Sequence, residues 1–348
     1  MMVPKQTGQS VRYMVYDCTQ ARGSTCYGWS DRIAGIVTTF IISILSRRQF
    51  LISFDTPCLL EDFLAPGDYD WRYNSSVAKN RSSSFHDLNN VRHKKIYKHM
   101  LGISDFNNYF KDDVIFLLMN WDYINTFRLR IDISREISWI TKYHQADIYK
   151  HVYNFLFKLS PFSVRALHER YLTKRKRSKI ACAHIRIGRN PNMPSDVTYK
   201  VAPPLITLWK YFDTLNKEEY DLFVATDTDS VKTEAKTRYP DNLIEILGNI
   251  THIDQTSSGD PREGFLTQLL DFYILIGCDV LIISNQSGFS LLAAYLRDRD
   301  DDLFCWRGRN LIPCSRHTAA DVIESIKFRG GQRPTLNGKA LKRAASNA

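Results

Sequence analysis

The chain has 348 residues, of which 44% are hydrophobic and 12% aromatic, so its composition excludes disordered and repeat-rich proteins. This length is sufficient for two domains with substantial cores. The formal net charge of +10 favours an anionic partner such as nucleic acid, a membrane surface or a phosphorylated ligand, although most basic surfaces are only solvated.

The first part of the chain predicts a βαβ unit after an unstructured lead at residues 1–10. The expected strands are 11–16, 50–54 and 113–119, and a buried helix follows the first of them. Gly28 permits a tight turn into that helix, and Ser30 or Asp31 can cap it. Backbone N–H groups at such a turn suit an anion. Because G-x-G-x-x-G is absent, a helix cap without a ligand is an equal alternative.

The segment that follows the second strand is polar up to Lys111, and residues 74–87 are typical of a surface insertion. Helical spacing returns from about residue 133 to residue 174. Its aromatic residues Tyr149, Tyr153 and Phe157 are expected in the core rather than as a base-stacking platform.

Seven cysteines leave at least one thiol free if the others pair. Two pairs, Cys18 with Cys26 and Cys305 with Cys314, could each close a small loop. Cys182 and Cys278 lie in apolar runs and are expected to be buried thiols. Four glycosylation sequons, at Asn74, Asn80, Asn249 and Asn285, hint at a secretory compartment.

A nearly continuous apolar strand at residues 180–187 is interrupted by His184 and Arg186. Ligands of open α/β sheets bind beyond the carboxyl ends of strands, and a guanidinium matches the geometry of a phosphate. We therefore predict that Arg186 is the centre of an anion site. A buried ion pair with an acidic residue is the alternative.

The second half alternates strands and helices, which predicts a parallel, doubly wound sheet with its strand-end loops on one edge. Those loops contain Arg186, Asp227 and Ser287. The expected strands are 180–187, 221–226, 243–247 and 280–284, and the expected helices are 203–215, 229–239, 264–276 and 287–296.

Three acidic and polar features of this half are candidates for ligand binding. Asp227 and Asp229 have the spacing of a DxD metal site, although a helix cap is the commoner use of this pattern. Asp271 lies among apolar residues and requires hydrogen-bond donors, for which the N–H groups of a purine base are suitable. Gln286 and Ser287 open a helix after a strand, an arrangement that favours phosphate.

Four segments resemble, in order, the motifs of the GDP-fucose-dependent fucosyltransferase superfamily, with the α1,6-fucosyltransferase branch the most similar. GWSDRIAGIVTTF resembles the glycine turn and first helix, and HIRIGR resembles the H-x-R motif. FVATDTDSVKTEAKTRYP resembles the ATD segment. LLDFYILIGCDVLIISNQS resembles the last motif, in which two aspartates and a serine are spaced by eight residues.

The resemblance implies a role for each matched residue. Arg186 would hold the β-phosphate and stabilise the leaving GDP, with His184 in the same nucleotide site. Asp271 would receive the guanine, and Ser287 would contact the phosphates. Gly28 with its neighbours would close the site from the first lobe, and Asp227 would be structural.

Two departures from the family pattern concern the active site. Arg189 follows Gly188 where several members carry an acidic residue, and Pro194 replaces a glutamate that some members place eight residues after the motif arginine. Asp196 is the nearest carboxylate, so we predict it as the base that deprotonates the acceptor hydroxyl.

These observations predict a two-lobed α/β protein of the GT-B type. An N-terminal lobe at 11–173 would face the acceptor, a Rossmann-like lobe at 174–325 would bind the GDP-sugar, and 326–348 would form a flexible basic tail. The resemblance implies inverting transfer of fucose from GDP-fucose to a glycan or glycoprotein hydroxyl, with no metal or other cofactor. The alternatives are a peptide O-fucosyltransferase or another nucleotide-sugar transferase, an inactive relative, and a non-catalytic basic module that binds RNA or an anionic glycan.

The family and the sequons predict a Golgi or luminal location. Because the sequence shows no signal peptide or anchor, a cytoplasmic location is the alternative. Membrane attachment would need an anchor that is not in this chain. No nucleic-acid partner is expected, because no strand interleaves aromatic and basic residues.

Overall fold

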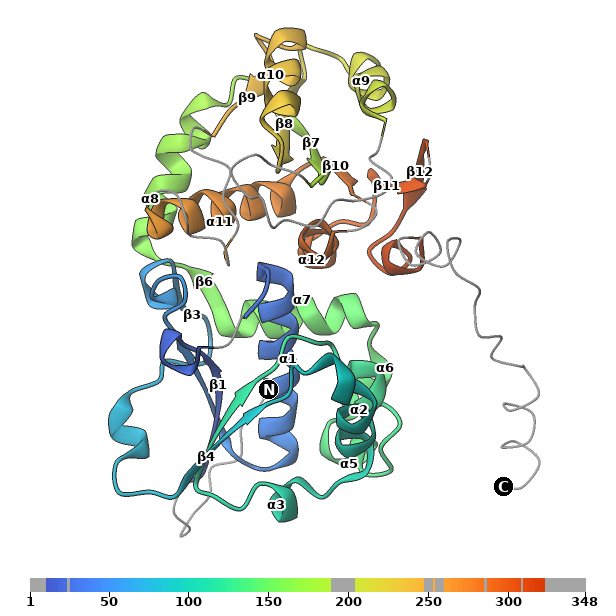
Figure 1. Cartoon of the computed structure of the whole chain (residues 1–348). Coiled ribbons are helices and arrows are strands. Elements are labelled where there is room, and N and C mark those ends of the chain that lie inside the picture. Colours follow the sequence, from blue (N-terminus) through green and yellow to red (C-terminus); the bar gives the residue numbers. More distant parts are fainter. Residues whose placement is uncertain are drawn as a thin grey trace, which may run out of the picture.

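The computed structural model describes residues 11–23, 26–188, 204–246, 253, 260–284, 287–307 and 309–322. These residues form two stacked lobes, each built on its own sheet (Figure 1). In this described part, no helix has both the length and the apolar character that a membrane span requires.

The N-terminal lobe is built on a four-stranded sheet of order β2-β1-β5-β4, in which every pair is parallel. Its strands are β1 (Tyr13–Cys18), β2 (Gln49–Phe54), β4 (Ser83–Asp87) and β5 (Val114–Leu118). Helix α1 (Trp29–Leu45) packs on β1 and β2 and is buried almost all round, as its apolar composition predicts. A two-stranded antiparallel ribbon joins β3 (Leu64–Pro66) to β6 (Phe157–Leu159).

Seven further helices occur among the described residues of the first part of the chain. They are α2 (Lys94–Ile103), α3 (Phe106–Tyr109), α4 (Ile124–Phe127), α5 (Ile133–Glu136), α6 (Ser138–Lys142), α7 (Gln145–Leu156) and α8 (Pro161–Arg170). Short 3₁₀ turns lie at Gln20–Arg22, Leu60–Asp62, Ser75–Ala78, Val91–His93 and Leu172–Lys174. Tyr149, Tyr153 and Phe157 are buried, so their assignment to the core is confirmed.

The polar segment at residues 74–87 is not merely a surface insertion. Its end forms β4, which pairs in parallel with β5 and completes the sheet. β4 is an edge strand whose residues are only half-buried or exposed. An edge strand of serines and a histidine lacks the apolar alternation by which strands are recognised, so the sequence pattern missed it.

The C-terminal lobe is built on a six-stranded sheet of order β12-β11-β10-β7-β8-β9. All neighbours are parallel except β11 and β12, which form an antiparallel hairpin at one edge. The strands are β7 (Lys179–Ile185), β8 (Tyr220–Thr226), β9 (Leu243–Ile244), β10 (Val280–Ile283), β11 (Leu303–Arg307) and β12 (Asn310–Cys314). The helices are α9 (Leu205–Asp213), α10 (Asp229–Arg238), α11 (Pro261–Gly277) and α12 (Gly288–Leu296).

Three disulfides occur in the described part of the chain. Cys18–Cys26 and Cys305–Cys314 close the two small loops considered from the sequence, and the second of them joins the hairpin strands. The expectation for Cys182 and Cys278 is wrong, because these residues form the third disulfide. Cys182 lies in β7 and Cys278 directly follows α11, so only the tertiary fold brings them together. Cys58 is the free thiol.

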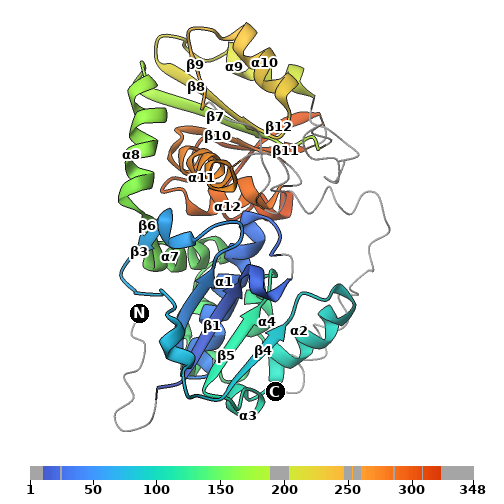
Figure 2. The ribbon, with the colours of Figure 1, turned by 60° about the vertical axis from the view of Figure 1, so that its left-hand side comes forward.

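The two lobes pack through helices, as both views show (Figure 1, Figure 2). Helix α12 packs on α7 and α1, and α8 packs on α11. The Trp29 ring makes edge contacts with Phe265 and Phe272 of α11, with centroid distances of 5.6 and 6.3 Å. Strands β1 to β6 precede residue 173 and strands β7 to β12 follow residue 174, while the predicted tail at 326–348 lies outside the described residues.

Candidate functional site

A cavity of about 180 Å³ lies between the lobes, at the ends of β7 and β8 and at the N-termini of α1 and α12. Eight of the ten predicted site residues line it: Gly28, Ser30, Asp31, His184, Arg186, Asp227, Asp271 and Ser287. The other two, Asp196 and Gln286, lie outside the described residues. The structure therefore brings together residues that are spread over about three quarters of the sequence.

Arg186 and Asp227 form an ion pair at the carboxyl edge of the C-terminal sheet, with Nη1 and Oδ2 3.1 Å apart. The pair follows from strand register, because Ile185 of β7 lies beside Thr226 of β8. The Asp227 carboxylate also accepts hydrogen bonds from the backbone N–H groups of Ile187, at 2.9 Å, and Gly188, at 2.7 Å. Arg186 thus has the buried acidic partner considered from the sequence, and it also lines the cavity.

The capping interpretation of Asp227 and Asp229 is wrong. Thr228 is the N-cap of α10 and makes no side-chain capping bond. Asp227 instead fixes the turn after β7, where Gly188 has a φ of 77°. Glycine adopts this left-handed conformation without the steric cost that a Cβ would add, so it allows two successive N–H groups to point at one carboxylate.

His184 is buried between the strand end and α12, with its ring centroid 5.3 Å from that of Phe289. Burial is the main cause that lowers the pKa of this imidazole to about 4, and Asp227 and Arg186 act on it in opposite directions. The ring is therefore neutral at physiological pH. Its Nδ1 atom has no hydrogen-bond partner among the described residues.

Asp271 projects from α11 at the point where the main cavity meets a smaller one of about 30 Å³. The smaller cavity lies between β8, β9 and α10. Its lining combines apolar residues, among them Phe223, Val224, Ala235, Ile244 and Ile246, with Lys232, Glu245 and Asp271. Burial raises the pKa of Asp271 to about 7, against the opposing effect of Lys232. A carboxylate beside an apolar slot suits a flat heterocycle that offers N–H donors.

The sequence analysis missed three polar residues that line the cavity: Lys232 on α10, and Thr267 and Gln268 on α11. In the described part, Thr267 Oγ1 and Gln268 Oε1 are buried without a hydrogen-bond partner. Both precede Asp271 by one helical turn, and residues three and four apart share a helix face. That spacing was the signal in the sequence that could have found them.

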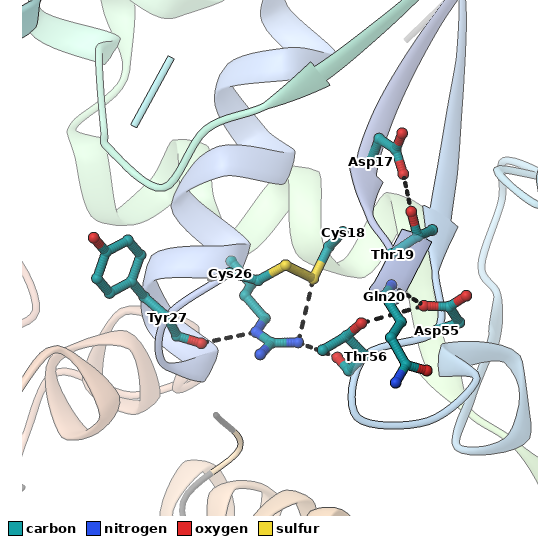
Figure 3. Close-up of a disulfide and its surroundings, with 9 residues drawn as sticks. Asp17, Cys18, Thr19, Gln20, Cys26, Tyr27, Asp55 and Thr56 are labelled. Atoms are coloured by element: carbon teal, nitrogen blue, oxygen red, sulfur yellow. Dashed lines mark hydrogen bonds between the residues drawn. A yellow bond between two sulfur atoms is a disulfide. The ribbon is translucent and has the colours of Figure 1, made fainter. Parts of the chain in front are cut away.

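The N-terminal lobe reaches the cavity through the first turn of α1. Gly28 is the N-cap, and Asp31 Oδ2 accepts its backbone N–H at 3.2 Å. Buried Arg32 holds the preceding turn, because its Nε donates to the Tyr27 carbonyl at 2.8 Å and its Nη1 donates to the Thr56 carbonyl and to Cys18 Sγ. Through the bond to Cys18 Sγ, this guanidinium contacts the Cys18–Cys26 disulfide. Figure 3 shows the disulfide between Tyr27 and Thr56.

The two helix N-termini almost touch. A Cβ atom at Gly288, the first residue of α12, would lie 2.5 Å from Ser30 Oγ and 3.1 Å from Ser30 Cβ. Ser287 is the N-cap of α12 and makes no side-chain capping bond. The positive ends of two helix dipoles, with Arg186 and Lys232, therefore favour a ligand that carries several negative charges.

Solved structures of similar fold support this description. Arabidopsis thaliana FUT1, a point mutant in complex with GDP, is 14% identical with a TM-score of 0.58, over 89% of this chain and 74% of that chain. NodZ α1,6-fucosyltransferase soaked with GDP-fucose is 12% identical with a TM-score of 0.55, over 88% and 99% of the two chains. Fucosyltransferase NodZ from Bradyrhizobium is 13% identical with a TM-score of 0.52, over 87% and 98%.

No family model matches the sequence, and no curated protein sequence matches it. At these identities the likeness concerns the fold. The chain has the two-lobed, GT-B-like α/β fold of these fucosyltransferases, so the predicted fold class is confirmed, and the resemblance to the superfamily is confirmed as a likeness of fold.

Proposed function

We propose that the protein is a glycosyltransferase that moves fucose from GDP-fucose to a hydroxyl acceptor. The observation that supports this most strongly is one cavity that combines the Arg186–Asp227 pair with Asp271, in a fold shared with structures solved with GDP or GDP-fucose. Residue roles do not follow from fold alone. They rest on the chemistry of this cavity.

The diphosphate binds at Arg186 and at the N-terminus of α12, and the first turn of α1 closes the cavity from the other lobe. A guanidinium forms two parallel hydrogen bonds to phosphate oxygens, and the unpaired N–H groups of the first turn of α12 add further donors. Neutral His184 contributes hydrogen bonding without charge. Ser287 lies at the start of α12, where its hydroxyl can reach the same phosphates.

The base binds in the smaller cavity beside Asp271. Guanine presents adjacent N1–H and N2–H donors, which match the two oxygens of one carboxylate. Adenine presents no such adjacent pair, and the N3–H of uracil lies between two carbonyls that repel a carboxylate. The rim of the cavity therefore favours guanine over these two bases.

Breaking the bond between fucose C1 and the phosphate oxygen leaves additional negative charge on GDP. Arg186 stabilises that charge more strongly in the transition state than in the ground state, and Asp227 holds the guanidinium in position. We further propose that transfer inverts the anomeric centre, needs no metal, and uses a glycan or glycoprotein acceptor. Three disulfides favour an oxidising compartment, which is consistent with a luminal location.

Turnover of GDP-fucose by purified protein tests this proposal, with a mixed glycan and peptide acceptor pool, with and without EDTA. Arg186→Ala should lower turnover by about 10²–10³-fold, as expected when a donor to the developing charge is removed. Arg238→Ala is the matched control, because Arg238 is exposed, interacts with Glu234 and the Trp209 ring, and does not line the cavity. Its turnover should equal that of the wild type.

Different failures of this experiment have different meanings. Activity that EDTA abolishes would overturn the metal-free mechanism. Turnover only on peptides would identify a peptide O-fucosyltransferase. If GDP does not bind, and RNA or anionic glycan binds with a steep salt dependence, the protein is a basic binding module.

A further inference from the structure

Two adjacent polar residues of α11, Thr267 and Gln268, line the cavity, and the proposed function gives them no role. Thr267 is 7% exposed, and its Oγ1 atom is buried without a hydrogen-bond partner among the described residues. The same holds for Gln268 Oε1. Buried polar atoms are normally hydrogen-bonded, and one that has no partner destabilises the folded protein. Two such atoms on neighbouring residues of one cavity are explained if a ligand supplies their partners.

The direction of α11 determines where this pair lies in the cavity. The helix joins β9 to β10, two strands that run parallel within one sheet, so it runs back against the strands and its N-terminal half lies nearest their carboxyl ends. Thr267 and Gln268 precede Asp271 by one turn on the same face. They therefore lie between Asp271 and the sheet edge that carries Arg186. Asp271 also lines the smaller cavity, whereas Thr267 and Gln268 line only the larger of these two.

We propose that Thr267 and Gln268 bind the ribose hydroxyls of the donor nucleotide and make the site selective for a ribonucleotide. This inference rests on the proposed function, in which Asp271 receives the base and Arg186 receives the diphosphate. The ribose of a nucleoside diphosphate connects the base to the phosphates. Residues between those two subsites consequently face the ribose, which carries a 2′-hydroxyl and a 3′-hydroxyl.

The chemistry of the two side chains matches a pair of neighbouring hydroxyl groups. A glutamine amide offers an acceptor oxygen and two N–H donors, and a threonine hydroxyl offers one donor and two acceptor positions. Each ribose hydroxyl can likewise donate one hydrogen bond and accept others. Both side chains are uncharged, so they complement a neutral sugar rather than a phosphate or a metal. A nucleotide that lacks one hydroxyl would leave a buried polar atom of this pair without its partner, and binding would be weaker.

Calorimetry with GDP, 2′-deoxy-GDP and 3′-deoxy-GDP tests this proposal in the wild type and in Gln268→Met, which removes the amide at nearly constant size. The wild type should bind GDP about tenfold more tightly than at least one of the deoxy analogues. In Gln268→Met this preference should fall below about threefold, because the variant loses affinity for GDP and keeps its affinity for the analogue. A general loss of structure would weaken all three nucleotides equally, so the preference separates ribose binding from a structural role.

Thr267→Val is a second variant that removes a hydroxyl at constant shape, and it keeps the test valid if Gln268→Met does not fold. It should also reduce the preference for GDP. A wild type that binds GDP and both deoxy analogues equally well would overturn the proposal. The same conclusion would follow if the folded variants kept the full preference of the wild type.

Fucose also carries hydroxyl groups, and a comparison of GDP with GDP-fucose distinguishes the two sugars. Ribose binding predicts that each variant loses affinity for GDP and for GDP-fucose by the same factor. A loss for GDP-fucose alone would mean that the pair binds fucose, and it would overturn the assignment to ribose.

Thr237→Val is the matched control for Thr267→Val. Thr237 is exposed on α10, its Oγ1 donates to the Thr233 carbonyl at 2.9 Å, and it does not line the cavity. This variant should keep the wild-type preference between GDP and the deoxy analogues. If the wild type does not bind GDP, the proposed function fails and this inference fails with it. If GDP binds without any preference for its ribose hydroxyls, only this inference fails.

Discussion

The two lobes carry the same kind of parallel sheet but contribute to the cavity in different ways. In the C-terminal lobe, His184 and Arg186 lie at the end of β7 and Asp227 lies at the end of β8. In the N-terminal lobe, the loop from β1 to α1 delivers Asp31, and a disulfide and Arg32 hold that loop. We infer that the C-terminal lobe binds the donor, and that the N-terminal lobe mainly affects turnover.

Asp227→Asn is the strongest test of this contrast. One of the two backbone N–H groups would face an amide NH₂ instead of an oxygen, and Arg186 would lose its ion pair. We expect turnover to fall by about 10²–10³-fold and GDP affinity to fall with it. Kinetics and calorimetry with GDP measure both effects. Weaker turnover at unchanged GDP affinity would contradict the assignment of donor binding to this edge.

Asp271 predicts a pH dependence of base binding. Its pKa of about 7 means that the carboxyl is protonated below that pH, whereas guanine requires the ionised form. GDP affinity should therefore fall about tenfold per pH unit below about 7 and level off above it. Asp271→Asn should bind GDP about 10–100-fold more weakly at pH 8 and lose this dependence.

Guanosine, which has no titrating phosphate, isolates the effect of the Asp271 carboxyl when its affinity is measured over the same pH range.

The raised pKa of Asp271 also affects the stability of the folded protein. The folded pKa is raised above the ordinary value of about 3.9, so the unfolded chain binds fewer protons between these values. The contribution of Asp271 to the free energy of unfolding should decrease as pH rises from about 4 to about 7, so the difference in this free energy between the wild type and Asp271→Asn should decrease over the same range. If the free energy of unfolding of Asp271→Asn depended on pH as that of the wild type does, the raised pKa of Asp271 would be refuted.

The C-terminal lobe was largely predictable from the sequence. Apolar runs of strand length alternate with helical spacing there, and a charged residue after a buried strand can only lie at a sheet edge. This placed Arg186, Asp227 and Ser287 together. The pairing of Arg186 with Asp227 was not predictable, because it depends on which strands are neighbours. The same holds for Cys182 and Cys278, which are 96 residues apart.

The N-terminal lobe was predicted less well. The glycine turn and α1 were recognisable from composition, but β4 has no apolar alternation and appears as a strand only because β5 provides a partner. The role of Arg32 in holding the loop before α1 could not be predicted from the sequence either. Its partners, the Tyr27 and Thr56 carbonyls, are backbone groups that a sequence pattern does not distinguish.

Gly288→Ala tests the contact between the lobes. The added Cβ would approach Ser30 Oγ to 2.5 Å and Ser30 Cβ to 3.1 Å. The hydroxyl can rotate away, but relief of the Cβ contact requires a small shift of the two helix N-termini. We expect a few-fold loss in GDP affinity, because the N–H donors at the start of α12 move relative to the phosphates. Gly277→Ala is the control, since no atom lies within 4 Å of its added Cβ. Equal GDP affinities of the two variants would show that the contact between α1 and α12 accommodates the added methyl group without moving the phosphate donors.

The double variant Cys18→Ser with Cys26→Ser should have the smallest effect on activity and the clearest separation between lobes. The disulfide joins residues only eight apart, so the chain-entropy model gives about 2–3 kcal/mol of stabilisation. Arg32 still holds the Tyr27 carbonyl after its removal, so we expect only a few-fold decrease in turnover. GDP affinity, measured by calorimetry, should not change, because the donor groups on β7, β8 and α11 lie in the other lobe. A parallel loss of GDP affinity would mean that the first turn of α1 is part of the donor site rather than its acceptor side, and the division between the lobes would be wrong.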